Sequence, residues 1–70
     1  MNKLNFKNYE TFQENGKWGI LDTSTYGIVA PCIFDEITWN SRTDSIVFSY
    51  HRKQAACHIE NLTSIDFSKI

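Results

Sequence analysis

Residues 13–22, Gln-Glu-Asn-Gly-Lys-Trp-Gly-Ile-Leu-Asp, carry the strongest structural signal in this 70-residue chain. Asn15-Gly16 predicts a two-residue type I′ turn, because both residue types tolerate the positive φ angles that this turn requires. The flanking residues 9–14 and 17–22 alternate or have β-type composition. The stretch therefore predicts an antiparallel β-hairpin.

Further strands and turns follow this hairpin at short, regular spacing. A turn of small polar residues spans Thr23–Gly27, and a β-branched strand, Ile28–Ala30, is expected to stop at Pro31. Residues 34–39 alternate loosely, so the first unit is expected to span residues 9–39.

The second half repeats this organisation. Ser45–Tyr50 is the clearest strand, a turn is expected at Arg52–Gln54, and the chain then returns over residues 55–60. At an offset of about 36 to 38 residues, Phe12 falls near Phe48 and Lys17 on Lys53, which indicates a duplicated β-unit. We expect an all-β fold, a small antiparallel meander of two hairpin-rich units (9–39 and 45–67) in one domain spanning 1–70.

Composition excludes several classes of protein. Seven Lys and Arg balance eight Asp and Glu, which excludes a polycationic nucleic-acid binder. No apolar stretch approaches the roughly 20 residues of a membrane span, so we expect a cytoplasmic protein without membrane contact. Two cysteines, Cys32 and Cys57, are fewer than a disulfide-stapled secreted domain carries. They are expected to act as small hydrophobic residues, with a disulfide between them as the alternative.

Three runs in order resemble the WG repeat: Asn15–Asp22 with its Lys-Trp-Gly, Gly27–Pro31, and Phe34–Ile37 with its aromatic-Asp-x-Ile step. The second unit reads as a degenerate copy without Trp-Gly. The resemblance implies a β-rich repeat with no shared catalytic chemistry and a role in interaction. The positions that match the family pattern are Trp18, Gly19, Gly27, Pro31, Phe34 and Asp35.

Each of these residues, together with Gly16, also has a structural interpretation. Trp18 is expected to anchor the core, and Gly19 to let another strand approach closely. Gly27 is expected at positive φ. Asp35 is expected to cap the backbone of a turn with its side chain.

No pattern points to catalysis or to a cofactor. His51, Cys57 and His58 lack the spacing of a metal site, and adjacent residues of a strand face opposite sides of a sheet. Asp35 and Glu36 are also adjacent, so in a strand their carboxylates would face opposite sides of the sheet and could not work as an acid–base pair. We therefore expect no enzyme activity, no catalytic or metal-binding residues and no cofactor.

The basic cluster His51-Arg52-Lys53, at a predicted hairpin tip, is the best candidate for binding. Aromatic residues near a basic tip can hold an anion or a base. The uncharged strand 45–50 is the best candidate for an exposed contact edge, unless it is central and covered within the monomer. The candidate binding residues are Trp39, Arg42, Phe48, Tyr50, His51, Arg52 and Lys53.

The sequence therefore predicts a non-enzymatic interaction module. A small bacterial or phage protein that binds and modulates a protein partner, as inhibitor, adaptor or immunity-type protein, fits these features. It would act within a complex or as a homo-oligomer, because about three repeat units are normally needed for a continuous core. The alternative is an oligomer that binds a small ligand or nucleotide with the basic tip and its aromatic residues.

Overall fold

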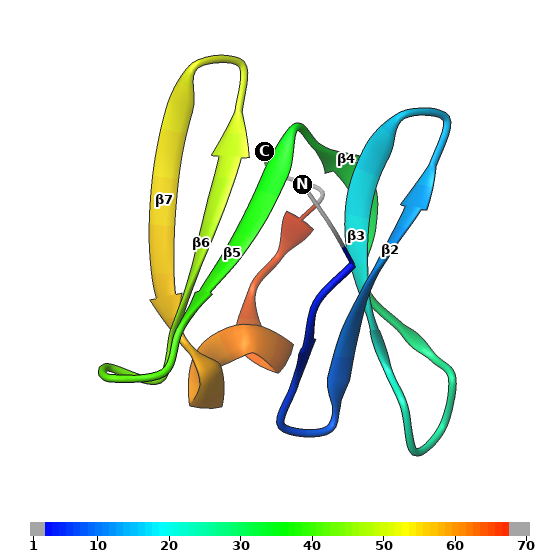
Figure 1. The fold of residues 1–70 in the computed structure, drawn as a ribbon, viewed down its shortest axis with the longest axis vertical. Coiled ribbons are helices and arrows are strands. Elements are labelled where there is room, and N and C mark those ends of the chain that lie inside the picture. Colours follow the sequence, from blue (N-terminus) through cyan, green and yellow to red (C-terminus); the bar gives the residue numbers. More distant parts are fainter. Residues whose placement is uncertain (1–2, 68–70) are drawn as a thin grey trace.

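The computed structural model describes residues 3–67 and confirms an all-β fold of two antiparallel sheets. Both sheets keep the strands in chain order (Figure 1). The first sheet contains β1 (Asn5–Phe6), β2 (Tyr9–Glu14), β3 (Lys17–Asp22) and β4 (Ile28–Phe34). The second contains β5 (Glu36–Asn40), β6 (Ser45–Tyr50) and β7 (Lys53–His58), followed by the 3-10 helix η1 (Ile59–Ser64).

Two type I′ turns close the main hairpins. Asn15 and Gly16 have φ angles of 55° and 79° between β2 and β3, which confirms the predicted turn. His51 and Arg52, at 48° and 68°, make the corresponding turn between β6 and β7. The prediction of a turn at Arg52–Gln54 was one residue too late, because residues without a glycine gave no signal for positive φ.

β4 continues through Pro31 as far as Phe34, so the expectation that the strand stops at Pro31 was wrong. β4 lies at the edge of its sheet, and its register against β3 shifts on both sides of Ile20. An edge strand with bulges tolerates proline, because the missing N–H is not needed for the ladder.

The expectation of positive φ at Gly27, in the turn between β3 and β4, was also wrong. Gly27 is not at positive φ, and Tyr26 takes that conformation instead, with φ of 58°. Asp22 organises this turn: its Oδ1 accepts hydrogen bonds from the Ser24 N–H and Oγ–H, at 2.8 and 2.6 Å. These bonds hold the pKa of Asp22 below its ordinary value.

The boundary between the two sheets lies at Asp35. β5 pairs with β6, so residues 36–39 belong to the second sheet and not to the meander predicted over 9–39. β1 and η1 were not predicted, since one is two residues long and the other has no regular apolar spacing. Phe12 and Phe48 occupy the predicted matching register, but Phe48 is in the core and Phe12 is only half-buried.

Strand β6 is the central strand of its sheet. It pairs with β5 on one side and with β7 on the other. The expectation that residues 45–50 form an exposed edge was therefore wrong, and the alternative of a central strand is correct. Its uncharged composition is explained by burial, since Ile46 and Phe48 are both in the core.

The core lies between the inner faces of the two sheets. Trp18 is 8% exposed, and Phe34 packs on Phe48 with ring centroids 4.6 Å apart. Leu62 of η1 closes one end of this core. The buried apolar residues are Phe6, Trp18, Ile20, Ala30, Phe34, Ile37, Ile46, Phe48 and Leu62.

Both main hairpins point to the same end of the molecule, at the top of Figure 1, and η1 lies at the opposite end. The chain after η1 turns back toward the hairpin end, and Phe67 reaches the rings of Phe34 and Phe48. No helix within residues 3–67 is long and apolar enough to cross a membrane.

Candidate functional site: an apolar groove beside β7

An apolar groove of about 420 Å³ lies between the inner face of the second sheet and the segment after η1. This volume is within the usual range of ligand-binding sites, roughly 300–1,000 Å³. Its walls come from β4, β6, β7 and the segment after η1. The lining residues are Phe34, Phe48, Tyr50, Lys53, Gln54, Ala55, Ala56, Cys57, Ile65 and Phe67.

Small side chains on β7 create this groove. Residues directly opposite in a sheet share a face, so Ala55 faces inward with its partner Phe48, and Cys57 with its partner Ile46. Ala55 carries only a methyl group and is exposed. Space therefore remains beside Phe48 that a larger residue on β7 would fill.

Three of the four aromatic rings that line the groove, those of Phe34, Phe48 and Phe67, contact one another. Phe67 makes edge-on contacts with Phe34 and Phe48, with centroids 5.9 Å away in each case. The position of Phe67 depends on η1, which begins where the Nδ1 atom of His58 accepts the Glu60 N–H at 3.2 Å. The cap and the buried Leu62 thus direct the following segment across the inner face of the sheet.

Lys53 is the one charged side chain among the described residues that line the groove. Its ammonium makes no salt bridge within residues 3–67, whereas Lys3, Lys7 and Lys17 are paired with Glu10, Asp44 and Asp35. The groove therefore combines an apolar lining with a cation at the hairpin end that has no acidic partner among the described residues.

Cys57 lines the groove as a neutral thiol. Burial raises the pKa of the Cys57 thiol, and it also raises that of Cys32. A raised thiol pKa lowers the fraction of thiolate, which is the nucleophilic form. Both cysteines are free, so the alternative of a disulfide between them is not seen in this structure.

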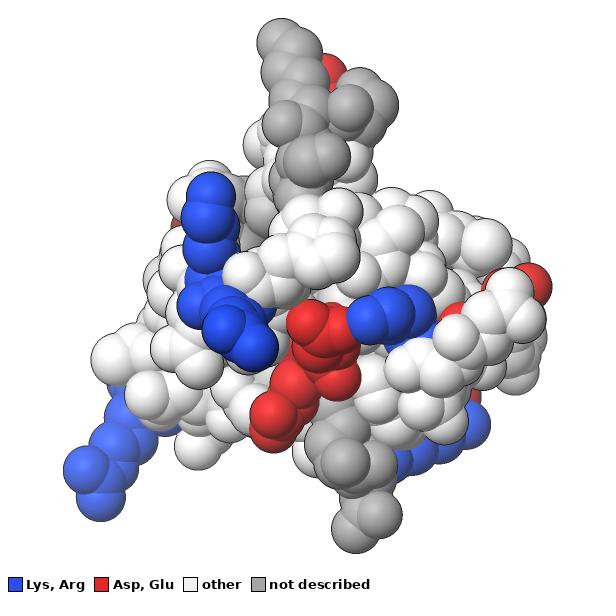
Figure 2. Space-filling model, turned by 90° about the horizontal axis from the view of Figure 1, so that it is seen from above, with Lys and Arg blue, Asp and Glu red and all other residues white. Residues whose placement is uncertain are grey.

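Asp35 connects the tips of the two hairpins. Its Oδ1 accepts from the Lys17 ammonium, and its Oδ2 accepts the His51 N–H at 3.2 Å. The hydrogen bond from Lys17 has the larger effect in holding the pKa of Asp35 below its ordinary value, and the bond from the His51 N–H acts in the same direction. Figure 2 shows this end of the molecule, where acidic side chains lie between basic ones. The negative charge of Asp35 reduces the attraction of the nearby β6–β7 turn for an external anion.

The structure brings only some of the predicted binding residues together. Phe48, Tyr50 and Lys53 share the groove, and the adjacent turn contains His51 and Arg52. The ring of His51 lies against Tyr50, with centroids 4.1 Å apart.

The other two predicted binding residues lie elsewhere. Trp39 stacks on Phe6 against the core, with centroids 4.9 Å apart. Arg42 precedes β6 and His51 follows it, so the six-residue strand separates them by about 17 Å. A single site built from the basic tip, Trp39 and Arg42 does not exist in this fold.

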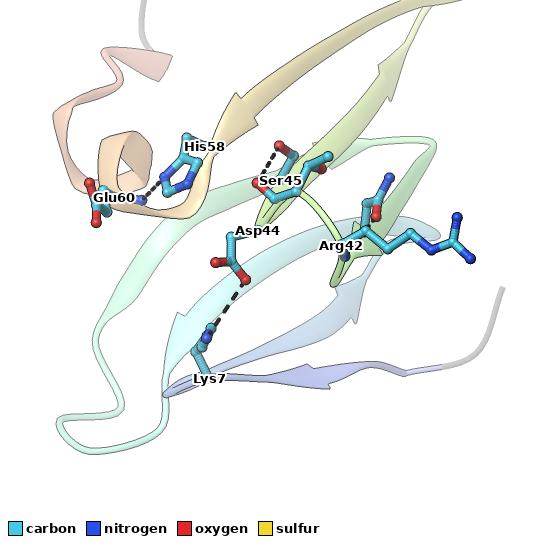
Figure 3. Close-up of polar contacts among 8 residues, drawn as sticks. Lys7, Arg42, Asp44, Ser45, His58 and Glu60 are labelled. Carbon is cyan, nitrogen blue, oxygen red and sulfur yellow. Dashed lines mark hydrogen bonds and ion pairs between the residues drawn. The ribbon is translucent and has the colours of Figure 1, made fainter.

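The end of the molecule near Arg42 carries exposed polar contacts (Figure 3). Lys7, in the turn after β1, extends toward Asp44, and their charged atoms lie 3.7 Å apart. The Asn40 Oδ1 accepts the Arg42 N–H at 3.0 Å. Exposed pairs of this kind contribute little to stability.

Ala55, Cys57, Ile65 and Phe67 were not predicted as site residues. The alternation of Lys53, Ala55 and Cys57 on one face of a strand was a usable signal, because small residues opposite Phe48 leave space. Nothing local to Ile65 or Phe67 indicates that the chain folds back there, because this depends on η1.

In comparisons with known proteins, no family model, no curated protein and no solved structure matches this chain. Within residues 3–67, no group of three or more His, Cys, Asp or Glu side chains could hold a metal ion. The groove and the strand beside it are therefore the features of this protein that point to a function.

Proposed function

We propose that this protein is a non-enzymatic interaction module, a small cytoplasmic protein of WG-repeat type from a bacterium or phage. It binds and modulates a protein partner, as an inhibitor, adaptor or immunity-type protein. The observation that supports this function is the open apolar groove along β7. Apolar hollows that a small domain leaves accessible are typical of interaction sites.

A small-ligand or nucleotide-binding oligomer is the second candidate. Lys53 favours it, because an ammonium that makes no salt bridge within residues 3–67 and lies beside aromatic rings suits an anionic, partly apolar molecule. The separation of Trp39 and Arg42 from the groove weakens this candidate, as does the carboxylate of Asp35 at the tip.

Co-purification with a groove-filling variant separates the two candidates. Ala55→Trp should fill the groove, and Thr38→Trp on the exposed outer face of β5 is the matched control. We expect a stoichiometric protein complex with the native protein and Thr38→Trp, and its loss with Ala55→Trp.

Two results would contradict the proposed function. One is a small molecule released on denaturation, with absorbance in the nucleobase band and no protein partner, which would establish the second candidate. The other is a complex that Ala55→Trp leaves intact, which would remove the groove as its basis. Sedimentation of the native protein at micromolar concentration tests self-association separately.

A further inference from the structure

We propose that the partner binds by adding an extended strand, antiparallel, to the free edge of β7, with an apolar side chain in the groove and a carboxylate beside Lys53. This inference rests on the proposed function and specifies its mode of binding and the chemistry of the partner. Strand addition combines main-chain hydrogen bonds with pockets for alternate side chains, and β7 offers both features.

The backbone of β7 has an unpaired side. In a hairpin with a two-residue turn the closing pair exchanges both hydrogen bonds, and every second pair does the same. Lys53, Ala55 and Cys57 therefore bond to β6, and the N–H and C=O groups of Gln54 and Ala56 point away from it. No strand within residues 3–67 pairs with this side.

Both edges of the first sheet are blunted, whereas the edges of the second sheet, β5 and β7, are regular, and of these two only β7 borders the groove. β1 has only two residues, and β4 contains Pro31 and two register shifts. β7 has six residues in continuous register with β6, without proline or a bulge. Its one Lys is at the first position, so the four residues 54–57 are uncharged. Natural proteins rarely leave such an edge unprotected unless it has a partner.

The first hairpin shows what covers the corresponding edge. β3 and β7 are the returning strands of two type I′ hairpins, and both begin directly after the turn. The outer edge of β3 is paired with β4, an apolar extended segment that runs antiparallel to it. Within the described residues, β7 has no counterpart of β4. A segment of similar character is the occupant that this edge fits.

Charge specifies the partner further. Neither Arg52 nor Lys53 makes a salt bridge within residues 3–67, although three other lysines are paired. Lys53 is at the start of β7, so an antiparallel partner brings its C-terminal end there. We therefore expect Asp or Glu near the C-terminal end of the bound segment and alternating apolar residues before it.

The test uses peptides selected from a random display library on the native protein. We expect the selected peptides to share alternating apolar residues that end in an acidic residue. A synthetic copy of one selected peptide then serves as the probe, and its dissociation constant is measured by fluorescence anisotropy.

Two pairs of variants locate the probe. Ala56→Pro removes an outward N–H without affecting the β6 ladder, and Ala56→Val keeps that N–H as the control. We expect Ala56→Pro to bind about tenfold more weakly than Ala56→Val. Lys53→Gln should weaken binding several-fold, whereas Arg42→Gln, at the far end, should not change it.

The peptide itself provides a readout that does not depend on the folding of a variant. Methylation of alternate backbone nitrogens of the probe blocks main-chain hydrogen bonds in one register only. We expect one of the two methylated versions to lose binding to the native protein and the other to retain it.

The outcomes distinguish this inference from the proposed function. If a partner protein binds, but Ala56→Pro and both methylated probes leave binding unchanged, strand addition is wrong and the interaction module stands. If sedimentation shows a dimer that Ala56→Pro abolishes, the occupant is a second copy of this chain and the acidic partner is rejected. If neither a peptide nor a partner protein binds, both proposals fail.

Discussion

Substitution of Gly19 by alanine tests how closely β4 approaches β3. A Cβ atom at Gly19 would lie 2.6 Å from the carbonyl oxygen of Ala30, 2.9 Å from the Pro31 carbonyl carbon and 3.0 Å from the Cys32 nitrogen. All three are backbone atoms, so no side-chain rotation can relieve the contact. β4 must move away from β3, which disturbs the bulged ladder and the packing of Ala30.

Overpacking of this kind costs about 1–3 kcal/mol. A 70-residue domain has a total unfolding free energy of about 4–10 kcal/mol, so the loss is a large fraction of it. Urea denaturation followed by the fluorescence of Trp18 and Trp39 measures the effect, and the midpoint should fall with little change in the slope.

Gly27→Ala is the matched control. Gly27 is not in the left-handed region, and its added Cβ would meet only the Oγ1 atom of Thr25, at 3.3 Å. Thr25 is exposed and its side chain can move, so we expect a change within about 0.5 kcal/mol. Equal midpoints for Gly19→Ala and the native protein would refute the proposed close approach of β4.

Three further predictions concern single residues. Gly16→Val should lower the free energy of unfolding by about 1 kcal/mol or more, since Gly16 has φ of 79°, and an unchanged melting temperature would show that this turn is not strained by valine. Trp18→Ala should cost about 3–5 kcal/mol and abolish the folded far-ultraviolet circular dichroism spectrum, whereas a folded variant that has lost only binding would make Trp18 a ligand platform. The pKa of Asp35 is below its ordinary value of 3.8, so its stabilising contribution is present above that pH and is lost as the pH falls through the lower folded pKa. The difference in melting temperature between the native protein and Asp35→Asn should therefore shrink between about pH 7 and about pH 2.5, and a constant difference would contradict this.

The all-β class and the first hairpin could be predicted because their signals are local. The Asn15-Gly16 turn determines its own backbone conformation, and the flanking strands follow from composition and alternation. The turn at His51 and Arg52 has the same geometry without such residues. It is held partly by the hydrogen bond from the His51 N–H to Asp35, sixteen residues away in the chain, which no local pattern reveals.

The remaining differences arise where tertiary structure decides between local alternatives. A proline is expected to end a central strand but is tolerated in an edge strand. The sequence around Pro31 does not indicate that β4 is an edge strand. The same holds for residues 45–50, whose apolar character fits either an exposed contact strand or a buried central one. The groove was predictable only in part, because Ala55 and Lys53 alternate on β7, whereas Phe67 reaches it through the fold of η1.

The agreement between strand order and chain order has a consequence for how this protein folds. Every ladder joins strands that are consecutive in the chain, so the entropic cost of loop closure is small for each of them. Hairpins of this kind form within about 1–10 μs, so docking of the two sheets is the slower step. Only Asp35 separates β4 from β5, and this short tether keeps the sheets at a high effective concentration for the packing of Phe34 on Phe48. Lengthening this link should therefore slow folding while leaving each hairpin intact.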